Sequence, residues 1–243
     1  MADYGNDPTE VAVPYHVFST SGFSVTFATE TGTSPACDER MLSGISGALL
    51  GATAAAKTHH AAMLETEAYR RPVSWSAEGF SLLDYDLVFL PGGHDKHVRP
   101  YIDSATLHAQ LGRYMAAMRG GAADKNLAAI CHGVQVLAHA TDKKGKSLIH
   151  DVETTALMGT METSIFWVTR PFLGDYYKTY GAGTPSVEES VKAKLDSPET
   201  QWKGNLSPTP FTHRDPKLRY ISARFPPDAE KLAKEAVEMV KSG

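Results

Sequence analysis

The chain has 243 residues, of which 42% are hydrophobic, and its formal net charge at pH 7 is −4. This length suits one α/β domain with a sizeable core, so we expect a single domain over residues 1–243. The weak charge argues against nucleic acid or an anionic membrane surface as a partner. The chain has only two cysteines, no apolar run of membrane-spanning length and an acidic beginning unlike a signal peptide, which together predict a cytoplasmic protein.

The first predicted element is a helix. Asp7 suits the N-cap, Pro8 suits the first helical position, and Glu10 stands where a capping box has its reciprocal acid. Pro14 would kink this helix if the helix continues past it. The next segment, residues 23–31, alternates apolar with small polar residues, which predicts a strand.

Two short apolar runs in the middle of the chain predict strands that are buried on both faces. The run LVFL at residues 87–90 follows acidic turn residues and stops at a Pro-Gly-Gly turn, and residues 126–131 form the second run. Between the two runs, residues 104–121 have the apolar spacing of an amphipathic helix that ends at two glycines.

The second half of the chain continues this alternation. A helix, two strands and a closing helix are predicted at residues 133–140, 154–158, 218–225 and 226–243. The alternation predicts an α/β fold with a mostly parallel central sheet, whose sites lie beyond the carboxyl ends of the strands. The segments 41–71 and 161–181 exceed the minimal alternation, and we expect them to add extra helices over one rim.

The most informative stretch is LAAICHGVQVLAHA, which places Cys131 between a predicted strand and a predicted helix. The helix dipole and free backbone N–H groups favour a thiolate there, and a sharp bend would push the side chain out of the sheet, as in a nucleophile elbow. His132 could relay protons, and Gly133 keeps the turn uncrowded. A buried structural cysteine beside a half-exposed histidine is the plain alternative.

Further candidates belong to the same predicted edge of the sheet. Gly92 and Gly93 let backbone N–H groups approach a ligand, which suits an oxyanion hole, although Pro-Gly-Gly is also simply a good turn. Glu10 could lie beside the thiol as a general acid or base with a raised pKa, or it could serve only the capping box. Glu162 could orient His132 or cap a neighbouring helix.

The remaining histidines do not have the spacing of a metal site. His59 and His60 lie in an alanine-rich helical segment, and His94 and His97 lie in a glycine-to-proline loop without an H-x-x-x-H or C-x-x-C motif. We therefore expect no metal and no other cofactor.

Several motifs together resemble one family. The chain looks like the ThiJ/PfpI superfamily of glutamine-amidotransferase-like proteins in the stretches VFLPGGHD, AAICHG and TEVAVPYHVFSTSGFSVTFATETG. Within that superfamily it is most similar to the glutathione-independent glyoxalase III and holding-chaperone branch. That likeness lies in the spacing of Glu10, Pro14 and Phe18 and in the segments TETG, CDERML and TDKKGKSLI.

The resemblance implies a flavodoxin-like three-layer sandwich that is usually dimeric, so we expect a homodimer. It implies that Cys131 is the nucleophile, His132 its neighbouring base and Glu10 the acid at the thiol. It also implies that Glu162 orients His132, and that Gly93 and the His132 N–H are the oxyanion donors. The substrate-binding turns are then formed by Gly92, Gly93, His94 and Gly133.

The implied function is that of a cofactor-free enzyme for small reactive carbonyls, which converts methylglyoxal to D-lactate through a thiol adduct. Two alternatives remain open. One is a cysteine hydrolase or hydratase for an amide, ester or specialised metabolite, held by an aromatic rim of Trp75, Trp167, Tyr176, Tyr177 and Tyr180. The other is a redox sensor or holding chaperone in which Cys131 is oxidised to a sulfinic acid.

Overall fold

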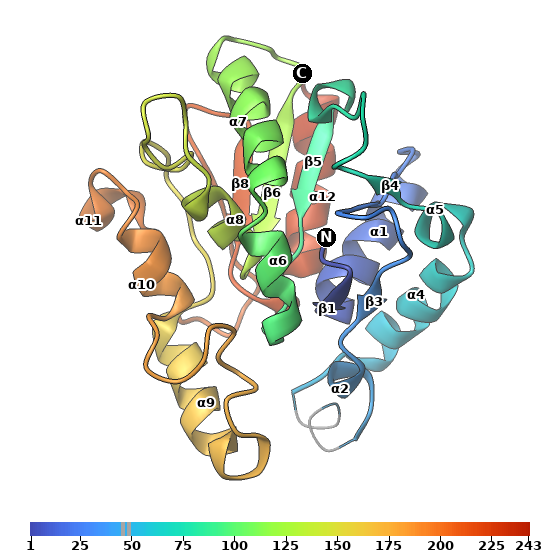
Figure 1. Cartoon of the computed structure of the whole chain (residues 1–243), viewed down its shortest axis with the longest axis vertical. Helices are drawn as coiled ribbons and strands as arrows, with labels where there is room; N and C mark the ends of the chain where they lie inside the picture. The colour runs from blue at the N-terminus through green and yellow to red at the C-terminus, as the bar shows by residue number, and fades with distance from the viewer. Residues whose placement is uncertain (45–46, 48–49) are drawn as a thin grey trace.

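The computed structural model describes residues 1–44, 47 and 50–243, and it shows helices packed on both sides of a mainly parallel sheet (Figure 1). The main sheet has the strand order β5-β6-β8-β7, and only the β7–β8 pairing is antiparallel. Its strands are β5 (Leu87–Leu90), β6 (Asn126–Ile130), β7 (Thr212–Arg214) and β8 (Tyr220–Ala223). The expected α/β sandwich is confirmed.

Strand β6 shows why the sheet is covered on both faces. All five of its residues are buried. Leu127 and Ala129 pack into the core on one face, and Ala128 and Ile130 pack into the core on the other. Because successive side chains of a strand point to opposite faces, an uninterrupted apolar run supplies both cores.

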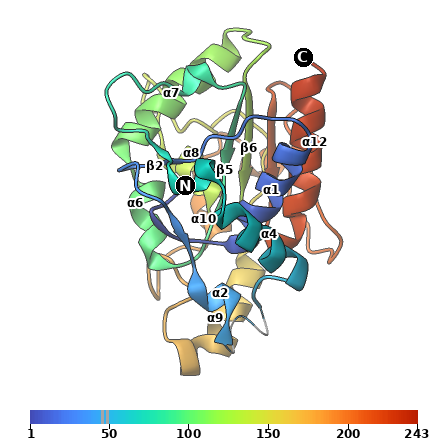
Figure 2. The ribbon, with the colours of Figure 1, turned by 90° about the vertical axis from the view of Figure 1, so that its right-hand side faces the viewer.

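Two groups of helices form the outer layers, with α1 and α12 on one side of the sheet and α6 and α7 on the other (Figure 2). Helix α8 leads directly from the end of β6 and packs with the α7 side. These helices are α1 (Pro8–Thr20), α6 (Arg99–Ile102), α7 (Ala105–Arg119), α8 (Gly133–His139) and α12 (Ala229–Lys241).

The two extra segments are helical, as expected, and both reach the same end of the molecule, where α2 and α9 lie (Figures 1 and 2). The helices that lie in these segments or continue into them are α2 (Glu39–Leu42), α4 (Ala54–Leu64), α5 (Glu67–Arg70) and α9 (Gly159–Leu173). The part of the first segment at residues 45–46 and 48–49 lies outside the described residues. Further helices are α10 (Val187–Lys192) and α11 (Pro198–Gln201), with 3-10 turns at Leu82–Asp84, Lys96–Val98 and Pro226–Asp228. None of the described helices has both the length and the apolarity to cross a membrane.

Two expected strands are wrong in extent. In the first, residues 23–31, only β2 (Ala28–Thr29) is a strand, and it pairs with β4 (Val73–Ser74). In the second, residues 154–158, only Thr154 is paired, through a single β-bridge to Trp202. A separate two-stranded sheet pairs β1 (Tyr4–Asn6) with β3 (Ala36–Cys37). An alternating pattern marks a segment that can be a strand, but a ladder also needs a neighbouring strand to pair with. Phe27 accepts a hydrogen bond from the Val73 N–H at 2.9 Å, but residues 24–26 make no backbone hydrogen bond within the described chain.

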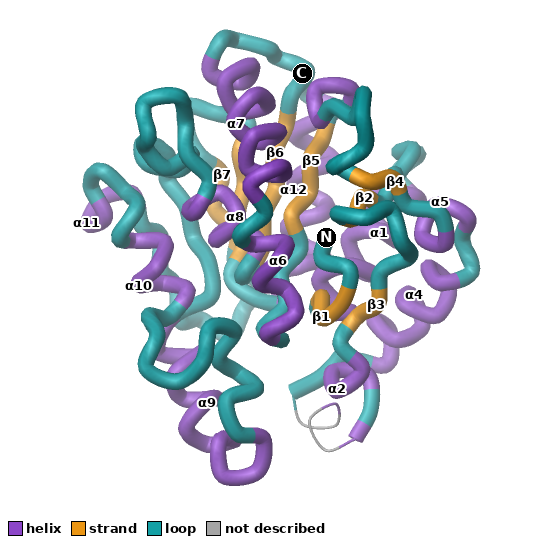
Figure 3. The backbone as a smooth tube through the Cα atoms, viewed as in Figure 1, coloured by secondary structure: helices purple, strands orange, loops and turns teal. Residues whose placement is uncertain are grey.

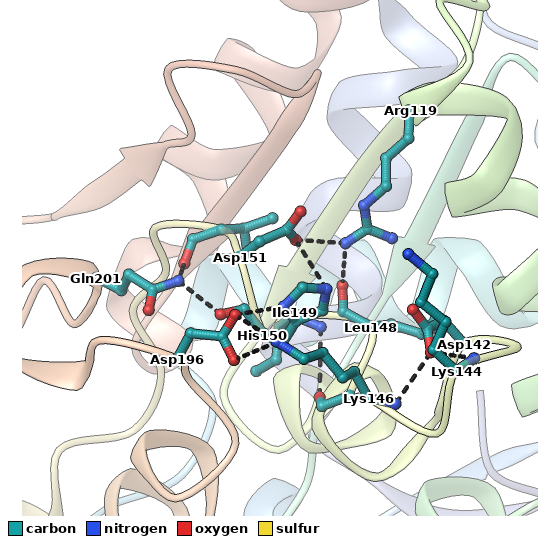
Figure 4. Close-up of polar contacts among 12 residues, drawn as sticks. Arg119, Asp142, Lys144, Lys146, Leu148, Ile149, His150, Asp151, Asp196 and Gln201 are labelled. Atoms are coloured by element: carbon teal, nitrogen blue, oxygen red, sulfur yellow. Dashed lines mark hydrogen bonds and ion pairs between the residues drawn. The ribbon is translucent and has the colours of Figure 1, made fainter.

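A polar network connects the loop after α8, residues 142–152, to α7 and α11 (Figure 4). Arg119 donates to Asp151 at 2.6 Å, and His150 Nδ1 lies 2.8 Å from an oxygen of Asp196. Gln201 donates to the carbonyl oxygen of His150 at 2.9 Å. These contacts tie residues 142–152 to α7 on one side and α11 on the other, so the chain enters α9 from a fixed position.

Candidate active site

Cys131 occupies a strained bend between β6 and α8. Its φ is 57°, and it is the one non-glycine residue of the described chain with a positive φ. Left-handed backbone is costly for such a residue and persists only where its surroundings hold it. Its N–H donates to the carbonyl of Ala223 at 3.1 Å. A Cβ at Gly133 would lie 2.1 Å from the carbonyl oxygen of Leu90, so the turn requires glycine there.

Gly92 lies against Cys131 because β5 and β6 are adjacent and end at the same edge. A Cβ on Gly92 would lie 2.7 Å from Oε2 of Glu10, 2.8 Å from the His132 nitrogen and 2.9 Å from Cβ of Cys131. Gly93 has a φ of 151°, and a Cβ there would lie 2.4 Å from a backbone oxygen. The two glycines therefore allow the strand ends and the Glu10 carboxyl to come together.

Glu10 is fully buried on the first turns of α1. Its Oε2 accepts a hydrogen bond from the Gly92 N–H at 2.9 Å, and its Oε1 is buried without a hydrogen-bond partner among the described residues. Asp7 alone caps the helix, accepting from the N–H groups of Thr9 and Glu10, so the reciprocal half of the capping box is absent. Burial, reinforced by the charge of Asp7, raises the pKa of Glu10 well above its usual value, which favours a protonated acid at the sulfur.

The sulfur of Cys131 is buried, and this corrects one expectation. Only 6% of the residue is exposed, and burial, reinforced by the charge of Glu10, raises the pKa of its thiol well above the usual value. The backbone N–H of His132 lowers that pKa, but desolvation outweighs it. The expectation that the bend favours a thiolate is therefore wrong. Neither the cavity of about 600 Å³ nor that of about 60 Å³ has Cys131 in its lining.

The ring of His132 joins the sulfur to Thr179. Nδ1 lies 3.3 Å from Sγ of Cys131, and Nε2 lies 2.9 Å from Oγ1 of Thr179. The Thr179 hydroxyl donates its single proton to the carbonyl of His94 at 2.7 Å, so it accepts from Nε2 of His132. Burial, with the charges of His94 and Lys178, lowers the pKa of His132 to about 3. The neutral ring therefore carries its proton on Nε2 and presents Nδ1 to the thiol as an acceptor.

Glu162 has other partners than His132. Its Oε1 lies 2.9 Å from Nζ of Lys178, and its Oε2 accepts from the Val187 N–H, the first residue of α10, at 2.7 Å. Glu162 therefore caps a neighbouring helix, the second of the two roles considered from the sequence. Thr179 holds the position at His132 that Glu162 was expected to hold.

An aromatic cluster covers this side of the site. The ring of His94 stacks on Tyr177 at 4.4 Å and meets Tyr176 edge-on at 4.6 Å. The hydroxyl of Tyr176 donates to Asp38, which tethers the cluster to the start of α2. Burial lowers the pKa of His94 to about 4, so this ring is neutral and its Nε2 has no hydrogen-bond partner within the described chain.

The other members of the expected aromatic rim lie elsewhere. Trp75 is 2% exposed and packs near Tyr101 in the core, whereas Trp167 is 59% exposed on α9. Tyr180 donates to Asp103 at 2.8 Å. The five aromatic residues therefore do not form one rim, because sequence spacing alone does not show which of them pack together.

Sequence reasoning missed Thr179, Lys178 and Asp38 as members of this environment. They come from a loop and a helix cap far from Cys131 in sequence, and no local pattern marks them. Over residues 1–44, 47 and 50–243, no group of three or more His, Cys, Asp or Glu side chains is arranged to hold a metal ion.

The fold and this site define an α/β sandwich with a strained cysteine at a strand-to-helix bend, at the carboxyl edge of a mainly parallel sheet. Residues 1–208 match the family described as ThiJ/PfpI family-like, and the chain belongs to that family.

Similar proteins agree with this assignment. An uncharacterised protein of Schizosaccharomyces pombe is 28% identical over 242 residues, which are 100% of this chain and 82% of that protein. The structure of the Rapid Encystment Protein of 24 kDa from Francisella tularensis superposes with a TM-score of 0.70 at 18% identity, covering 98% of this chain and 96% of that one. Glyoxalase III from Candida albicans superposes with a TM-score of 0.68 at 18% identity, covering 98% and 90%. At these identities the structural likeness shows the fold.

Proposed function

We propose that the protein is a cysteine-dependent enzyme that isomerises and hydrates small dicarbonyls without a cofactor, with methylglyoxal giving D-lactate. The observation that carries this proposal is the grouping of two side chains around Cys131. Nδ1 of His132 lies 3.3 Å from Sγ of Cys131, and a Cβ on Gly92 would lie 2.7 Å from Oε2 of Glu10 and 2.9 Å from Cβ of Cys131. The likeness in fold to a protein named glyoxalase III supports the same class of chemistry.

The first step is addition of the thiol to the aldehyde. The S–H proton of Cys131 passes to Nδ1 of His132 as the sulfur attacks the aldehyde carbon, and the carbonyl oxygen takes up a proton to give a hemithioacetal. A protonated Glu10 is a suitable donor for that oxygen because burial raises its pKa. The thiol is a neutral reactant whose proton leaves only during attack, which suits a buried sulfur.

The second step moves hydrogen between the two carbons. A base removes the proton from the former aldehyde carbon while the ketone oxygen takes up a proton, which gives an enediol. The neighbouring carbon then takes up a proton while the hydroxyl on the sulfur-bearing carbon loses its proton, which leaves a thioester of 2-hydroxypropanoate. Water hydrolyses the C–S bond, releases lactate and returns the proton to the thiol. The net reaction consumes one methylglyoxal and one water for each lactate, with no external oxidant or reductant.

The direct test is a lactate assay on purified protein supplied with methylglyoxal. We expect turnover that disappears in Cys131→Ser and persists in Cys37→Ser, which removes the other free cysteine. Circular dichroism and the melting temperature show whether each variant keeps its fold. Lactate production that continues in a folded Cys131→Ser variant would contradict the proposal. A folded wild-type protein without activity on methylglyoxal, but with Cys131-dependent cleavage of esters or amides, would favour the hydrolase alternative.

A further inference from the structure

The candidate active site is closed in this structure. Cys131 is 6% exposed, His132 is 1% exposed and Glu10 is fully buried. Neither the cavity of about 600 Å³ nor that of about 60 Å³ has any of these three residues in its lining. A small molecule can therefore reach the sulfur only if a segment that covers it moves.

One covering segment, residues 175–180, has the features of a movable element. Figure 3 shows it as part of the loop that runs between α9 and α10. Residues 176–179 are all buried, whereas Gly174 before them is exposed and Gly181 after them is half-buried. The segment therefore inserts four consecutive side chains into the molecule between two positions close to the surface.

The backbone of this segment is bonded only locally. The N–H groups of Tyr176, Lys178 and Gly181 each donate to the carbonyl three residues earlier. Among the described residues, no backbone-to-backbone hydrogen bond joins residues 174–181 to a position outside 170–184. A movement of the segment as a unit would therefore break no strand or helix ladder of the main fold.

Side chains hold the segment in place instead. The Tyr176 hydroxyl donates to Asp38, and Nζ of Lys178 lies 2.9 Å from Oε1 of Glu162. The aromatic rings of the segment pack with Phe166 of α9 in a small cluster that is separate from the large core clusters. Opening returns both charges of the ion pair to water and exposes only this small cluster, so it costs far less than unfolding the domain.

Glycines stand at both ends of the segment. Gly174 has a φ of 60° and Gly181 a φ of 95°, and nothing lies within 4 Å of the position that a Cβ would take on either. Their backbone can change conformation without meeting a neighbour, which is what a hinge requires.

A buried atom beneath this cover lacks a partner. Oε1 of Glu10 has no hydrogen-bond partner among the described residues, although the residue is fully buried. Buried polar atoms are almost always bonded, so an unpartnered one points to a polar molecule that binds there.

We propose that residues 175–180 form a lid, hinged at Gly174 and Gly181 and held shut by the hydrogen bond from Tyr176 to Asp38, whose opening admits small carbonyl compounds to Cys131. The lid also carries Thr179, whose hydroxyl lies 2.9 Å from Nε2 of His132 in the closed state. Closing therefore excludes water and fixes the tautomer of His132 in the same movement. This second role rests on the proposed function, whereas control of access to the sulfur does not.

The test measures how fast iodoacetamide alkylates Cys131. It uses the full chain with Cys37→Ser, so that mass spectrometry follows a single thiol. We expect alkylation about a hundredfold or more slower than in the urea-unfolded chain, at a rate that low urea hardly changes, because opening a lid exposes little surface. Tyr176→Phe removes the hydroxyl that holds the lid shut and should speed alkylation about tenfold to hundredfold, as expected for loss of a hydrogen bond to a charged group.

Tyr114→Phe is the matched control. Tyr114 is also a buried tyrosine, but it lies on α7 and its hydroxyl donates to the backbone carbonyls of Tyr85, Asp86 and Asn126. Its loss should lower the free energy of unfolding and leave the alkylation rate of Cys131 in the absence of urea unchanged.

Three results would overturn the lid. They are equal acceleration in the two variants, an unchanged rate in a folded Tyr176→Phe protein, and alkylation that rises with urea as steeply as global unfolding. Lactate production is measured separately. Lid-controlled alkylation in a protein that does not turn over methylglyoxal would refute only the proposed function, and turnover without acceleration in Tyr176→Phe would refute only the lid.

Discussion

Oγ1 of Thr179 lies 2.9 Å from Nε2 of His132, across 47 positions of sequence, and its own proton is committed to the carbonyl of His94. This arrangement fixes the proton of the neutral ring on Nε2. Nδ1, 3.3 Å from Sγ of Cys131, is therefore free to accept the thiol proton. The hydroxyl of Thr179 thus sets the tautomer that the proposed chemistry requires without touching the sulfur itself.

Thr179 is a positioning residue, and removing its hydroxyl should make His132 a less effective base. We expect Thr179→Val to lower kcat on methylglyoxal roughly tenfold to hundredfold, since general base catalysis contributes about 10²–10⁴-fold. Thr179→Ser keeps the hydroxyl and should restore most of the activity. Nitrogen chemical shifts of His132 report the tautomer directly, and an unchanged tautomer in Thr179→Val would show that the hydroxyl does not set it.

Asp7 should make the protein less stable as pH rises through the weakly acidic range. Burial raises its pKa from 3.8 to about 6, so the folded state holds a proton that the unfolded state has lost between these values. The stabilisation is complete below pH 3.8 and is lost as pH rises to 6, with a total of about 3 kcal/mol. Asp7→Asn, which keeps a capping oxygen, should lack this loss. Denaturant unfolding of both proteins at pH 4 and 7 measures the difference, and an equal gap at both values would contradict the assignment.

The buried ion pair of Glu162 and Lys178 should contribute to stability and not to the orientation of His132. Lys178→Met leaves a carboxylate buried without its partner, and we expect a loss of about 3–5 kcal/mol in the free energy of unfolding. The double variant Lys178→Met with Glu162→Gln should lose less. Glu162→Gln alone should leave the His132 tautomer as it is, and a change of tautomer there would restore the orienting role predicted from the sequence.

Two glycine substitutions should have opposite effects. Gly133→Ala forces a Cβ to 2.1 Å from a backbone oxygen at the end of β5, so we expect severe destabilisation at the elbow. Gly112→Ala lies inside α7, where the nearest atom to a new Cβ is 3.7 Å away. Alanine there should raise the free energy of unfolding by about 0.5–1 kcal/mol. Melting temperatures of the two variants test both statements, and a Gly133→Ala protein as stable as the wild type would show that the bend relaxes.

The expected homodimer has a candidate interface on α9. Val168 is 75% exposed, Phe172 is 87% exposed and Trp167 is 59% exposed, which is a large apolar surface for one helix. We expect a dimer by light scattering after size exclusion, and a monomer when Val168 and Phe172 are both changed to Glu. Leu206→Glu removes another exposed apolar side chain and should leave the dimer intact. A wild-type monomer at high concentration would exclude this interface.

The sequence predicted a structural element correctly wherever the evidence for that element lay within one segment of the chain. The unbroken apolar runs of β5 and β6 indicated strands buried on both faces, and both are present. The same runs placed Gly92 and Cys131 at one edge, because neighbouring parallel strands end together. Asp7 was correctly expected to cap α1, since capping depends on a side chain and the next three residues.

Where the expectation failed, the missing information lay in a distant segment. Residues 24–26 belong to a segment that alternates like a strand, but they have no neighbouring strand within the described chain and make no backbone hydrogen bond there. The helix end after Cys131 suggested a thiolate, yet the direction of its pKa shift follows from how completely other segments exclude water from the sulfur.

The sequence by itself determined the α/β sandwich, the elbow at Cys131 and the glycines that its turn requires, because periodicity and backbone sterics act over a few residues. Only the tertiary structure decided that Thr179 rather than Glu162 contacts His132, and that Cys131 is buried. The hydrogen-bond partners of a side chain and the exclusion of water from it depend on which distant segments pack around it, and that packing forms only when the whole chain folds.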